Sequence, residues 1–271
     1  MAQKRPFITM LTDFGLQDTY AAIMKGVIYT LNPSAVVIDI SHNIKPQDVQ
    51  QAAFQLLSCY RYFPKGTIHV VVVDPGVGSA RKMIVAKTSD YYFVAPDNGV
   101  LSYVLQKERS VVIREITNKK YFLQKLSNTF HGRDVFAPVA VHLCRDTACR
   151  VPTVYKQLGT VCKTPLLLPL CVPSKTKNTI KGTMIHIDHF GNIITNITAK
   201  EVRGWRSVIT TIKNKEIHGL SSSYASVAKG KLLVIEGSTG FFEIARREGS
   251  AAHFLKVQKG TKIMMRRTDN V

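Results

Sequence analysis

The sequence predicts an α/β protein, with a mainly parallel α/β/α domain at the N-terminus and a smaller β domain after it. Three observations support this class. Apolar strand-like runs alternate with helix-like segments over the first half of the 271 residues. A proline-rich stretch interrupts that pattern, and short strand-like runs separated by turn residues then follow. Strands and helices that alternate with short connections favour right-handed crossovers and a parallel sheet.

The elements of the first half follow from two periodicities. Continuous apolar runs of five or six residues are typical of buried parallel strands, and apolar residues spaced by three and four predict helices. Pro46 suits the first turn of the second helix. The predicted elements are strand 7–11, a helix from 18 or 19 to 32, strand 35–40, a helix from 46 to 60, strand 68–73, a hairpin of 83–88 and 91–95, strand 111–116 and helix 133–144.

The second half changes in character around a stretch that contains Pro165, Pro169 and Pro173. We therefore predict an N-terminal domain over residues 1–160, a linker over 161–178 and a C-terminal domain over 179–271. Short strands with little helix signal indicate a small β-barrel or sandwich. The predicted strands are 183–187, 193–197, 207–212, 232–236 and 261–266.

Composition limits the function classes. The net charge of +19 raises the question of nucleic acid, but the basic residues are scattered and not interleaved with aromatic rings, so we expect no nucleic-acid partner. The five cysteines lack a CxxC pair, which predicts neither a disulfide framework nor a metal site. No apolar stretch is long enough for a membrane span and no signal peptide is evident, so we expect a cytoplasmic protein without membrane contact.

The first candidate site lies where two predicted strands end. Asp13 and Asp74 each follow a strand, and ligands of parallel sheets bind beyond the carboxyl ends of the strands. Asp74 opens a glycine-rich turn that allows close approach of a ligand, and Arg81 is placed to return toward the carboxylate. A tight turn with a surface ion pair is the alternative. The segment matches neither a P-loop nor a full dinucleotide fingerprint.

Three further segments carry polar groups that suit a ligand. Residues 127–134 place His131 just before a helix, where a side chain is open to a site, although a lone histidine is more often structural. Residues 188–192 offer a carboxylate, an aromatic ring and an amide, with a polar hairpin turn as the alternative. Residues 237–246 are equally compatible with a simple loop and strand.

Taken together, these segments resemble the S-adenosylmethionine (SAM) hydroxide adenosyltransferases, the hydrolytic relatives of fluorinase and chlorinase. Their order and approximate spacing match that family, and the resemblance extends from Ile8 to about Leu255. The segments that carry it are TDFG at 12–15, DPGVGSAR at 74–81, NTFHGRD at 128–134, DHFGN at 188–192 and STGFFEIA at 238–245.

The resemblance implies a Rossmann-like N-terminal domain, a small β-barrel domain, and a homotrimer whose sites lie between one subunit's N-terminal domain and its neighbour's C-terminal domain. It implies hydrolysis of SAM to adenosine and methionine, with no cofactor or metal. The implied roles are Asp74, Arg81 and His131 to hold the attacking water or hydroxide, Asp13 for the ribose hydroxyls, Asp188 for the methionine ammonium, Phe190 and Asn192 for the adenine, and Ser238, Glu243 and Arg246 to complete the pocket.

Two alternatives stay open at this point. A halide-dependent SAM adenosyltransferase would need an apolar halide pocket in place of the three polar residues Asp74, Arg81 and His131, and Gln47 stands where fluorinase has an aromatic residue. A non-catalytic binder of nucleosides or nucleic acid would instead use the positive charge. Arg246 stands where relatives often have a small apolar residue, so its backbone alone is expected to contribute.

Overall fold

The computed structural model describes residues 5–147, 153–169 and 172–268. The chain forms two compact units, with unit 1 ending at residue 168 and unit 2 beginning at residue 169. This division falls inside the predicted linker, in which residues 170 and 171 lie outside the described part of the chain. The backbone amide of Leu168 donates to the Ser102 hydroxyl at 2.7 Å, so the chain stays packed on unit 1 almost to the division.

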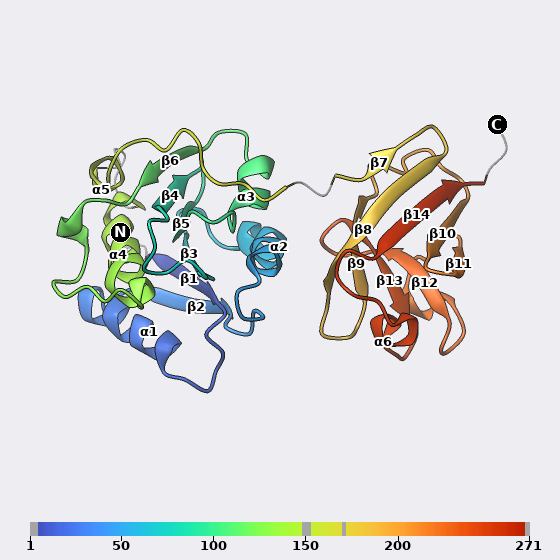
Figure 1. Ribbon diagram of the computed structural model, residues 1–271, viewed down its shortest axis with the longest axis horizontal. Coiled ribbons are helices and arrows are strands. Elements are labelled where there is room, and N and C mark those ends of the chain that lie inside the picture. The colour runs from blue at the N-terminus through green and yellow to red at the C-terminus, as the bar shows by residue number, and fades with distance from the viewer. Residues whose placement is uncertain (1–4, 148–152, 170–171, 269–271) are drawn as a thin grey trace. The chain divides into compact units, whose positions relative to one another are not determined.

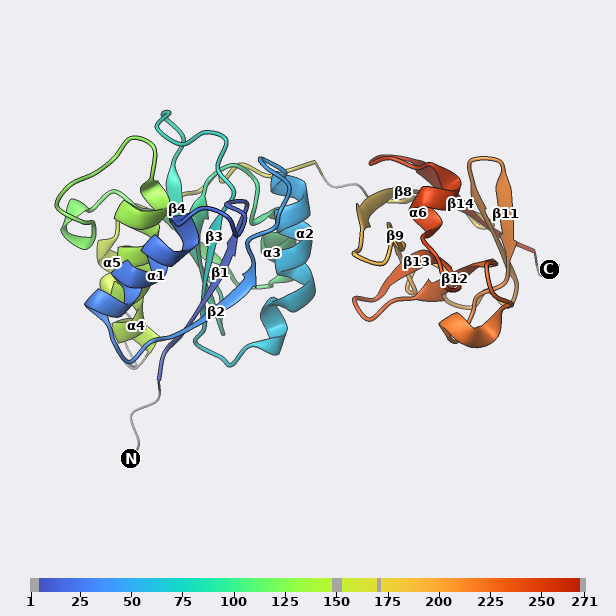
Figure 2. The ribbon, with the colours of Figure 1, turned by 90° about the horizontal axis from the view of Figure 1, so that it is seen from below.

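Unit 1 has three layers (Figure 1). Its six strands lie in the order β2-β1-β3-β5-β4-β6, and the first four are parallel. Helices α1, α4 and α5 lie on one face of the sheet and α2 and α3 on the other (Figure 2). This arrangement confirms the predicted N-terminal α/β/α fold. The elements are β1 Phe7–Thr12, α1 Tyr20–Leu31, β2 Val36–Ser41, α2 Val49–Cys59, β3 Ile68–Val72, β4 Met83–Lys87, β5 Tyr92–Pro96, α3 Ser102–Lys107, β6 Val112–Glu115, α4 Ala137–Thr147 and α5 Val154–Gln157.

Two predicted elements differ in detail from the structure. Strand β2 was expected to be buried but is only partly covered, because it forms the edge of the sheet. Helix α2 begins at Val49 and not at Pro46. Gln47 has a left-handed φ of 66°, which cannot continue into a helix, and the Asp48 side chain then caps α2 by accepting from the amide of Gln51.

The helix predicted at residue 133 begins with a π-helical turn, Gly132–Phe136, which leads directly into α4. Short 3₁₀ turns at Tyr60–Tyr62 and Lys119–Tyr121 were not predicted, and neither were α3 and α5. A π-helical turn is uncommon and is found frequently at functional sites.

Unit 2 is a nearly closed antiparallel barrel of eight strands, which confirms the β-barrel prediction. Its path runs β11-β10-β14-β8-β9-β13-β12, with β7 paired to β8. A bridge between Ser221, just after β11, and Ile235 of β12 brings the two ends of the path together. The elements are β7 Ser174–Lys175, β8 Thr179–Ile187, β9 Ile193–Thr198, β10 Val208–Ile212, β11 Lys215–His218, a 3₁₀ turn Tyr224–Ser226, β12 Leu232–Glu236, β13 Phe241–Arg246, α6 Ala251–Leu255 and β14 Lys262–Arg267.

Within the described residues, none of the helices has the length and apolar character needed to cross a membrane. Cys59 and Cys162 are free thiols, and the Cys144 thiol donates to the carbonyl of Ala140 at 3.4 Å. Burial raises the pKa of Cys144 to about 12, so this thiol is held in its unreactive protonated form. Cys149 and Cys171 lie outside the described residues.

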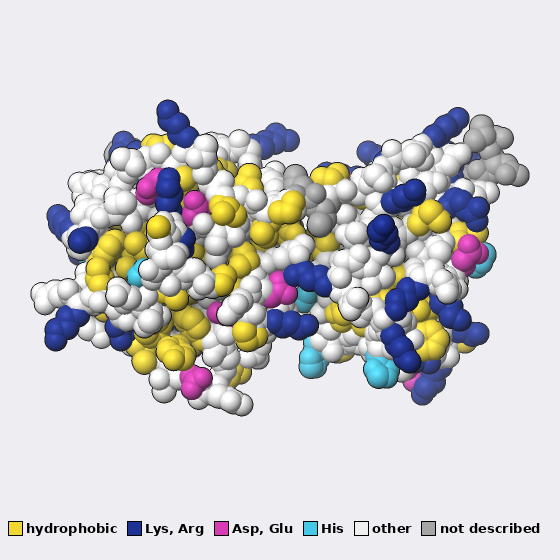
Figure 3. Space-filling model, in the orientation of Figure 1, with side chains coloured by type: hydrophobic (Ala, Val, Ile, Leu, Met, Phe, Trp, Pro, Cys, Tyr) yellow, Lys and Arg dark blue, Asp and Glu magenta, His cyan; other side chains and the backbone are white. Residues whose placement is uncertain are grey.

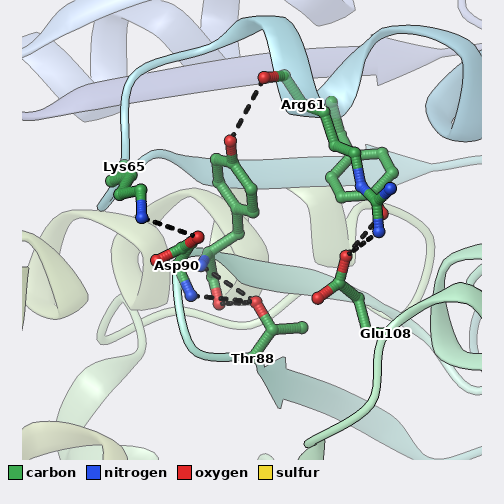
Figure 4. A network of polar contacts seen from close by, with 7 residues as sticks. Arg61, Lys65, Thr88, Asp90 and Glu108 are labelled. Carbon is green, nitrogen blue, oxygen red and sulfur yellow. Dashed lines mark hydrogen bonds and ion pairs between the residues drawn. The ribbon is translucent and has the colours of Figure 1, made fainter.

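A network of polar contacts joins residues 60–65, which follow α2, to the turn before β5 and to the turn after α3 (Figure 4). Glu108 accepts hydrogen bonds from the Tyr60 hydroxyl at 2.6 Å and from the Arg61 guanidinium at 2.7 Å. Burial alone would raise the pKa of Glu108, but these two bonds hold it below its usual value. Lys65 pairs with Asp90 at 3.2 Å in the turn that precedes β5. These contacts fix the edge of the sheet at which β3 and β5 begin.

His69 lies fully buried at the centre of β3, beside the same network. Its Nδ1 is 2.8 Å from the Thr9 hydroxyl, its ring stacks on Phe93 at 5.0 Å, and Tyr60 and Tyr91 contact its edges. The Nε2 atom has no hydrogen-bond partner. Burial therefore lowers the pKa of His69 from 6.5 to about 3, and the ring is neutral in the folded chain.

We expect His69 to make the stability of unit 1 sensitive to acid. In the unfolded chain His69 takes up a proton below about pH 6.5, whereas in the folded chain it stays neutral until about pH 3. The unfolding free energy therefore falls as the pH is lowered through this window, by up to about 1.4 kcal/mol per pH unit from this one group. His69→Phe keeps the aromatic packing and should flatten that slope in urea unfolding measured from pH 7 to 4. An unchanged slope would contradict this origin.

Candidate active site

Two carboxylates of unit 1 leave the sheet side by side. Strands β1 and β3 are parallel neighbours, with Thr12 paired to Val72, so the residues that follow them emerge at the same edge. Asp13 is the first residue after β1, and Asp74 comes two residues after the end of β3. The Asn98 side chain donates to the carbonyl of Val73 at 2.8 Å and fixes the chain just before Asp74. The site therefore begins at the carboxyl edge, as the sequence predicted.

Asp74, Arg81 and His131 lie in direct contact. The Arg81 Nε donates to both Asp74 oxygens, at 2.9 and 3.0 Å, and its Nη2 also binds Oδ2. The same Nη2 lies 2.9 Å from His131 Nδ1. The side chains of Asp74 and Arg81 are only 5% and 9% exposed, so this is an interior ion pair and not the surface pair considered as an alternative. The structure thus brings His131 into contact with a pair that lies fifty or more residues earlier in the sequence.

The turn that carries Arg81 packs directly on the loop that carries His131. Gly78 has a φ of +77°, and a Cβ atom on it would lie 2.6 Å from the carbonyl oxygen of Asn128. A side chain at this position would force the two loops apart. Glycine is therefore required here both for the backbone conformation and for the close approach.

The buried carboxylate of Asp134 fixes the loop that carries His131. Asp134 is completely buried in the π-helical turn and accepts from the backbone amide of Ser127 at 2.6 Å, with Arg133 as its ion-pair partner. Gly132 lies against the Met24 sulfur and the Phe130 ring, where a Cβ atom would come within 3.0 and 3.3 Å. The backbone at His131 is thus fixed on both sides. Sequence reasoning assigned no role to Asp134, although it is the last residue of the NTFHGRD segment.

The contact with Arg81 determines the form of the His131 ring. A guanidinium only donates, so Nδ1 must accept and carries no proton, which places the ring proton on Nε2. Burial lowers the pKa of His131, the positive charge of Arg81 lowers it further, and the carboxylates of Asp74 and Asp134 oppose the shift. His131 is therefore neutral near pH 7 and presents an N–H donor on the side away from Arg81.

Asp13 is positioned by a strained backbone residue. Its Oδ2 accepts from the amide of Gln47 at 2.8 Å, and Gln47 is the exposed residue with a left-handed φ of 66°. A non-glycine residue in this conformation costs about 1 kcal/mol or more and is found preferentially at functional positions. The sequence placed Gln47 near the site, but the role of its backbone amide could not be predicted from it.

In unit 2, Asp188 organises the β8–β9 turn. Its Oδ1 accepts from the amides of Phe190 and Asn192 at 2.9 and 2.8 Å, and its Oδ2 accepts from the Asn192 side chain at 2.9 Å. Asn192 is buried, whereas the Phe190 ring is 76% exposed. The polar-turn interpretation of this segment is therefore correct as far as the backbone is concerned. The turn also presents an uncovered aromatic face.

Glu243 of β13 lies close to Asp188 and is buried. The Tyr224 hydroxyl donates to its Oε2 at 3.0 Å. Burial raises the pKa of Glu243 and the charge of Asp188 adds to that effect, while the hydrogen bond from Tyr224 opposes it. A Cβ on Gly237 would meet the Glu243 carboxylate within 2.0 Å, so this glycine makes room for it. Tyr224 was missed by sequence reasoning, since a tyrosine in a serine-rich loop gives no distinctive signal.

Ser238 and Arg246 are placed differently. Ser238 lies exposed in the turn between β12 and β13. Arg246 is three residues after Glu243 on the same strand, and successive side chains of a strand alternate between faces, so the two point to opposite sides of β13. The Arg246 guanidinium lies 4.4 Å from the centre of the Phe254 ring, and its Nε donates to the Gly230 carbonyl at 2.9 Å. Its side chain is thus engaged away from Glu243.

A cavity of about 990 Å³ lies away from these residues, at the edge where β1 and β3 begin, and is lined by residues such as Phe7, Thr67 and Val141. It contains none of the predicted site residues. Among residues 5–147, 153–169 and 172–268, no group of three or more His, Cys, Asp or Glu side chains is arranged to hold a metal ion.

Comparison with known families agrees with this geometry. Residues 8–151 match the SAM hydroxide adenosyltransferase N-terminal domain, and residues 182–264 match the C-terminal domain of the same family. The chain belongs to the SAM hydroxide adenosyltransferase family. The resemblance inferred from the five sequence segments is therefore confirmed.

Relatives within the SAM hydroxide adenosyltransferase family include (R)-S-adenosyl-L-methionine hydrolases. One from Methanocaldococcus jannaschii is 41% identical over 200 residues, covering 72% of this chain and 68% of the relative. One from Salinispora tropica is 33% identical and covers 95% and 97% of the two chains. A crystal structure of an uncharacterized conserved protein from Thermotoga maritima is 39% identical, with a TM-score of 0.88 over 96% of this chain and 100% of that one. Fluorinases match at 22 to 24% identity.

The protonation of His131 in this SAM hydroxide adenosyltransferase can be tested without any substrate. We expect nuclear magnetic resonance titration of the His131 ring to give a pKa below 6.5. Asp74→Asn removes a nearby negative charge and should lower the pKa further, whereas Arg81→Met removes the nearby positive charge and should raise it. A His131 pKa that does not respond to either variant would contradict the contact described above.

Proposed function

We propose that the protein hydrolyses SAM to adenosine and L-methionine, with Asp74, Arg81 and His131 holding the attacking water. The observation that carries the proposal is the direct contact chain Asp74–Arg81–His131 at the carboxyl edge of the sheet. Close relatives that cover nearly the whole chain bear the name (R)-S-adenosyl-L-methionine hydrolase, which supports the same substrate.

The reaction places modest demands on the protein. The oxygen of water attacks the ribose C5′, the C5′–S bond breaks, and its electron pair stays on sulfur, which leaves as the neutral thioether of methionine. The leaving group therefore needs no acid and no cofactor, and the main requirement is to align water opposite the C5′–S bond. One proton of the water is released overall.

The three side chains can divide this task. The Asp74 carboxylate accepts a hydrogen bond from the water and takes up proton density late in the displacement. The remaining Arg81 donors can point toward the water oxygen, and His131 holds the Arg81 guanidinium in place by accepting from it at Nδ1. Because Arg81 binds both other groups, its guanidinium is fixed from two sides.

The remaining predicted residues are proposed as substrate contacts. Asp13 binds the ribose hydroxyls, and Phe190 packs on the adenine with Asn192 at its polar edge. Asp188 already accepts three hydrogen bonds, and its Oδ2 retains capacity for one more donor such as the methionine ammonium. Ser238 and Glu243 complete the pocket, and Arg246 contributes its backbone alone, since its side chain binds Gly230 and Phe254.

We further propose that the protein works as a homotrimer, with each site built from unit 1 of one subunit and unit 2 of its neighbour. The candidate residues fall into two groups, one in each unit. A heterologous contact repeated three times closes into a ring, and each ring interface can then complete one site.

The triad predicts a specific kinetic defect. Asp74→Ala, Arg81→Ala and His131→Ala should each lower kcat by about 10²-fold or more, because they hold the water in the transition state. The Kd for SAM should change little, because the substrate is held by other residues. Adenosine release measured by chromatography and SAM binding measured by calorimetry separate the two effects.

Asp90→Ala is the matched control, since it also breaks an aspartate–cation pair of unit 1 but lies at the other edge of the sheet (Figure 4). It should retain wild-type turnover. Asp74→Asn keeps the shape of the side chain, so it separates a loss of turnover from a folding defect caused by truncation. Full activity in all three alanine variants would contradict the proposed mechanism.

The halide-dependent alternative is tested with the same assay. Incubation with SAM in the presence of chloride or fluoride should give adenosine as the nucleoside product, because the polar side chains of Asp74, Arg81 and His131 occupy the place where a halide would need an apolar pocket. A 5′-halo-5′-deoxyadenosine product would replace hydrolysis as the function.

A non-catalytic binder of nucleosides or nucleic acid would require a surface patch in which Lys and Arg side chains are concentrated. On the face drawn in Figure 3, Lys and Arg side chains are spread over both units and interspersed with uncharged surface. Such scatter is typical of a solvated basic surface. Salt-sensitive RNA or DNA binding that is unchanged in Asp74→Ala, together with absent adenosine release, would favour the binder.

The shared site predicts complementation between two inactive variants. Asp74→Ala disables unit 1 and Asp188→Ala disables unit 2, so each variant alone should have little activity. In mixed trimers, a subunit with an intact unit 1 next to a neighbour with an intact unit 2 forms a working site, and random mixing makes about a quarter of the sites intact. Co-expression of the two variants should therefore recover about a quarter of wild-type turnover, and analytical ultracentrifugation should give a trimer. No recovery would contradict the shared site.

A further inference from the structure

A chain of polar side chains runs behind Asp13, and the proposed function leaves it unused. Lys25 of α1 pairs with Asp39 Oδ2 at 2.5 Å, and Asp39 Oδ1 lies 3.1 Å from Nε2 of His42. The His42 Nδ1 lies 2.8 Å from the hydroxyl of Thr12. Thr12 is completely buried and His42 is 3% exposed, so water cannot replace the contact between these two side chains, whereas Lys25 and Asp39 are 32% and 37% exposed. We call the pair formed by Thr12 and His42 the Thr12–His42 clamp.

The contacts indicate which atom of each group carries a hydrogen and which atom accepts one. The Asp39 carboxylate accepts from Lys25 and lies 3.1 Å from His42 Nε2 without forming a hydrogen bond to it, and its negative charge favours the ring proton of His42 on Nε2. Nδ1 is then an acceptor and binds the Thr12 O–H. The Thr12 hydroxyl donates its hydrogen bond to His42 Nδ1, and its oxygen accepts from the backbone amide of Phe14 at 3.3 Å. Each group along the chain thus has a defined role as donor or acceptor.

The clamp fixes the backbone on both sides of Asp13. The carbonyl of His42 accepts from the amide of Gly15 at 2.8 Å, and the amide of Ile44 donates to the carbonyl of Thr12 at 3.4 Å. Together with the bond from Thr12 to Phe14, these contacts anchor residues 12, 14 and 15 to the segment after β2. The Asp13 side chain is the group that this anchored turn presents.

A second pair in the same sheet shows what the clamp adds. Thr9 and His69 form the same hydroxyl–Nδ1 contact, also at 2.8 Å and also buried. Neither histidine forms a hydrogen bond through Nε2, but the Nε2 of His42 lies 3.1 Å from Asp39, whereas His69 lies among aromatic rings. Thr9 lies three residues before Thr12 on β1, away from the Asp13 turn. The two pairs therefore match in local chemistry and differ in their connection to the site.

We propose that Thr12, His42 and Asp39 are positioning residues that set the specificity of the site for ribose hydroxyls by holding Asp13 in place. The inference rests on the proposed function, in which Asp13 binds those hydroxyls. A carboxylate selects hydroxyl-bearing ligands only while its oxygens stay within a few tenths of an ångström of the correct position, which needs support from the surrounding residues.

The experiment compares kcat/KM for SAM and for its 2′,3′-dideoxy analogue. The wild type and Thr12→Ser, which retains the hydroxyl, should prefer SAM. Thr12→Val and His42→Phe should lose about tenfold or more in kcat/KM for SAM, chiefly through KM, and little for the analogue, so that the preference disappears. The controls Thr9→Val and His69→Phe should retain the wild-type preference. In an Asp13→Ala background, Thr12→Val should cause no further loss.

Equal losses for both substrates in Thr12→Val and His42→Phe, or a further loss in the Asp13→Ala background, would overturn the proposal and leave the proposed function intact. Absence of SAM hydrolysis by the wild type would overturn the proposed function and, with it, the ribose specificity.

Amide hydrogen exchange tests the clamp independently of the kinetics. Exchange at the amides of Phe14 and Gly15 should be faster in Thr12→Val than in Thr9→Val. Equal exchange would remove the structural basis of the clamp.

Discussion

The pairing of Asp74 with Arg81 is the interaction on which the rest of the site depends. Both side chains are almost fully buried, so bulk water solvates neither charge well and each depends on the other for compensation. Removing one partner of such a pair typically costs about 3 to 5 kcal/mol, because the other charge is left unpaired. The pair is possible only because β3 is rigid and buried, and because the glycine turn after it brings Arg81 back over seven residues. The His131 ring contacts the pair through the Arg81 guanidinium, and not through the Asp74 carboxylate.

The two units carry different electrostatic environments. In unit 1 the buried carboxylate is balanced by a guanidinium, which suits the proposed role of holding an uncharged water molecule. In unit 2, Asp188 and Glu243 lie close enough for one to raise the pKa of the other, and the Arg246 side chain is turned to the opposite face of its strand. Such a pair of carboxylates favours a ligand that carries positive charge. A sulfonium amino acid with a free ammonium group has that property.

Strong local patterns predicted most of the fold, and long-range contacts account for what they missed. The buried strand β3 and the turn after it were evident from continuous apolar residues and closely spaced glycines. The partial exposure of β2 depends on strand order, which no local pattern encodes. The start of α2 was misplaced because Pro46 is a good first-turn residue, whereas the left-handed conformation of Gln47 accompanies a contact between its amide and Asp13, thirty-four residues earlier. The contact of His131 with Arg81 joins residues fifty positions apart, and the family resemblance rather than any spacing suggested it.

The close approach of Gly78 to the carbonyl of Asn128 has a consequence for anyone who exchanges parts between members of this family. The two loops form one interlocking surface, with no layer of adjustable side chains between them. A chimera that imports the 74–81 segment from a distant relative, but keeps the native 127–134 segment, combines two shapes that were never fitted to each other. Successful transplants should therefore carry both segments from the same parent, and libraries that randomise one loop should allow compensating changes in the other.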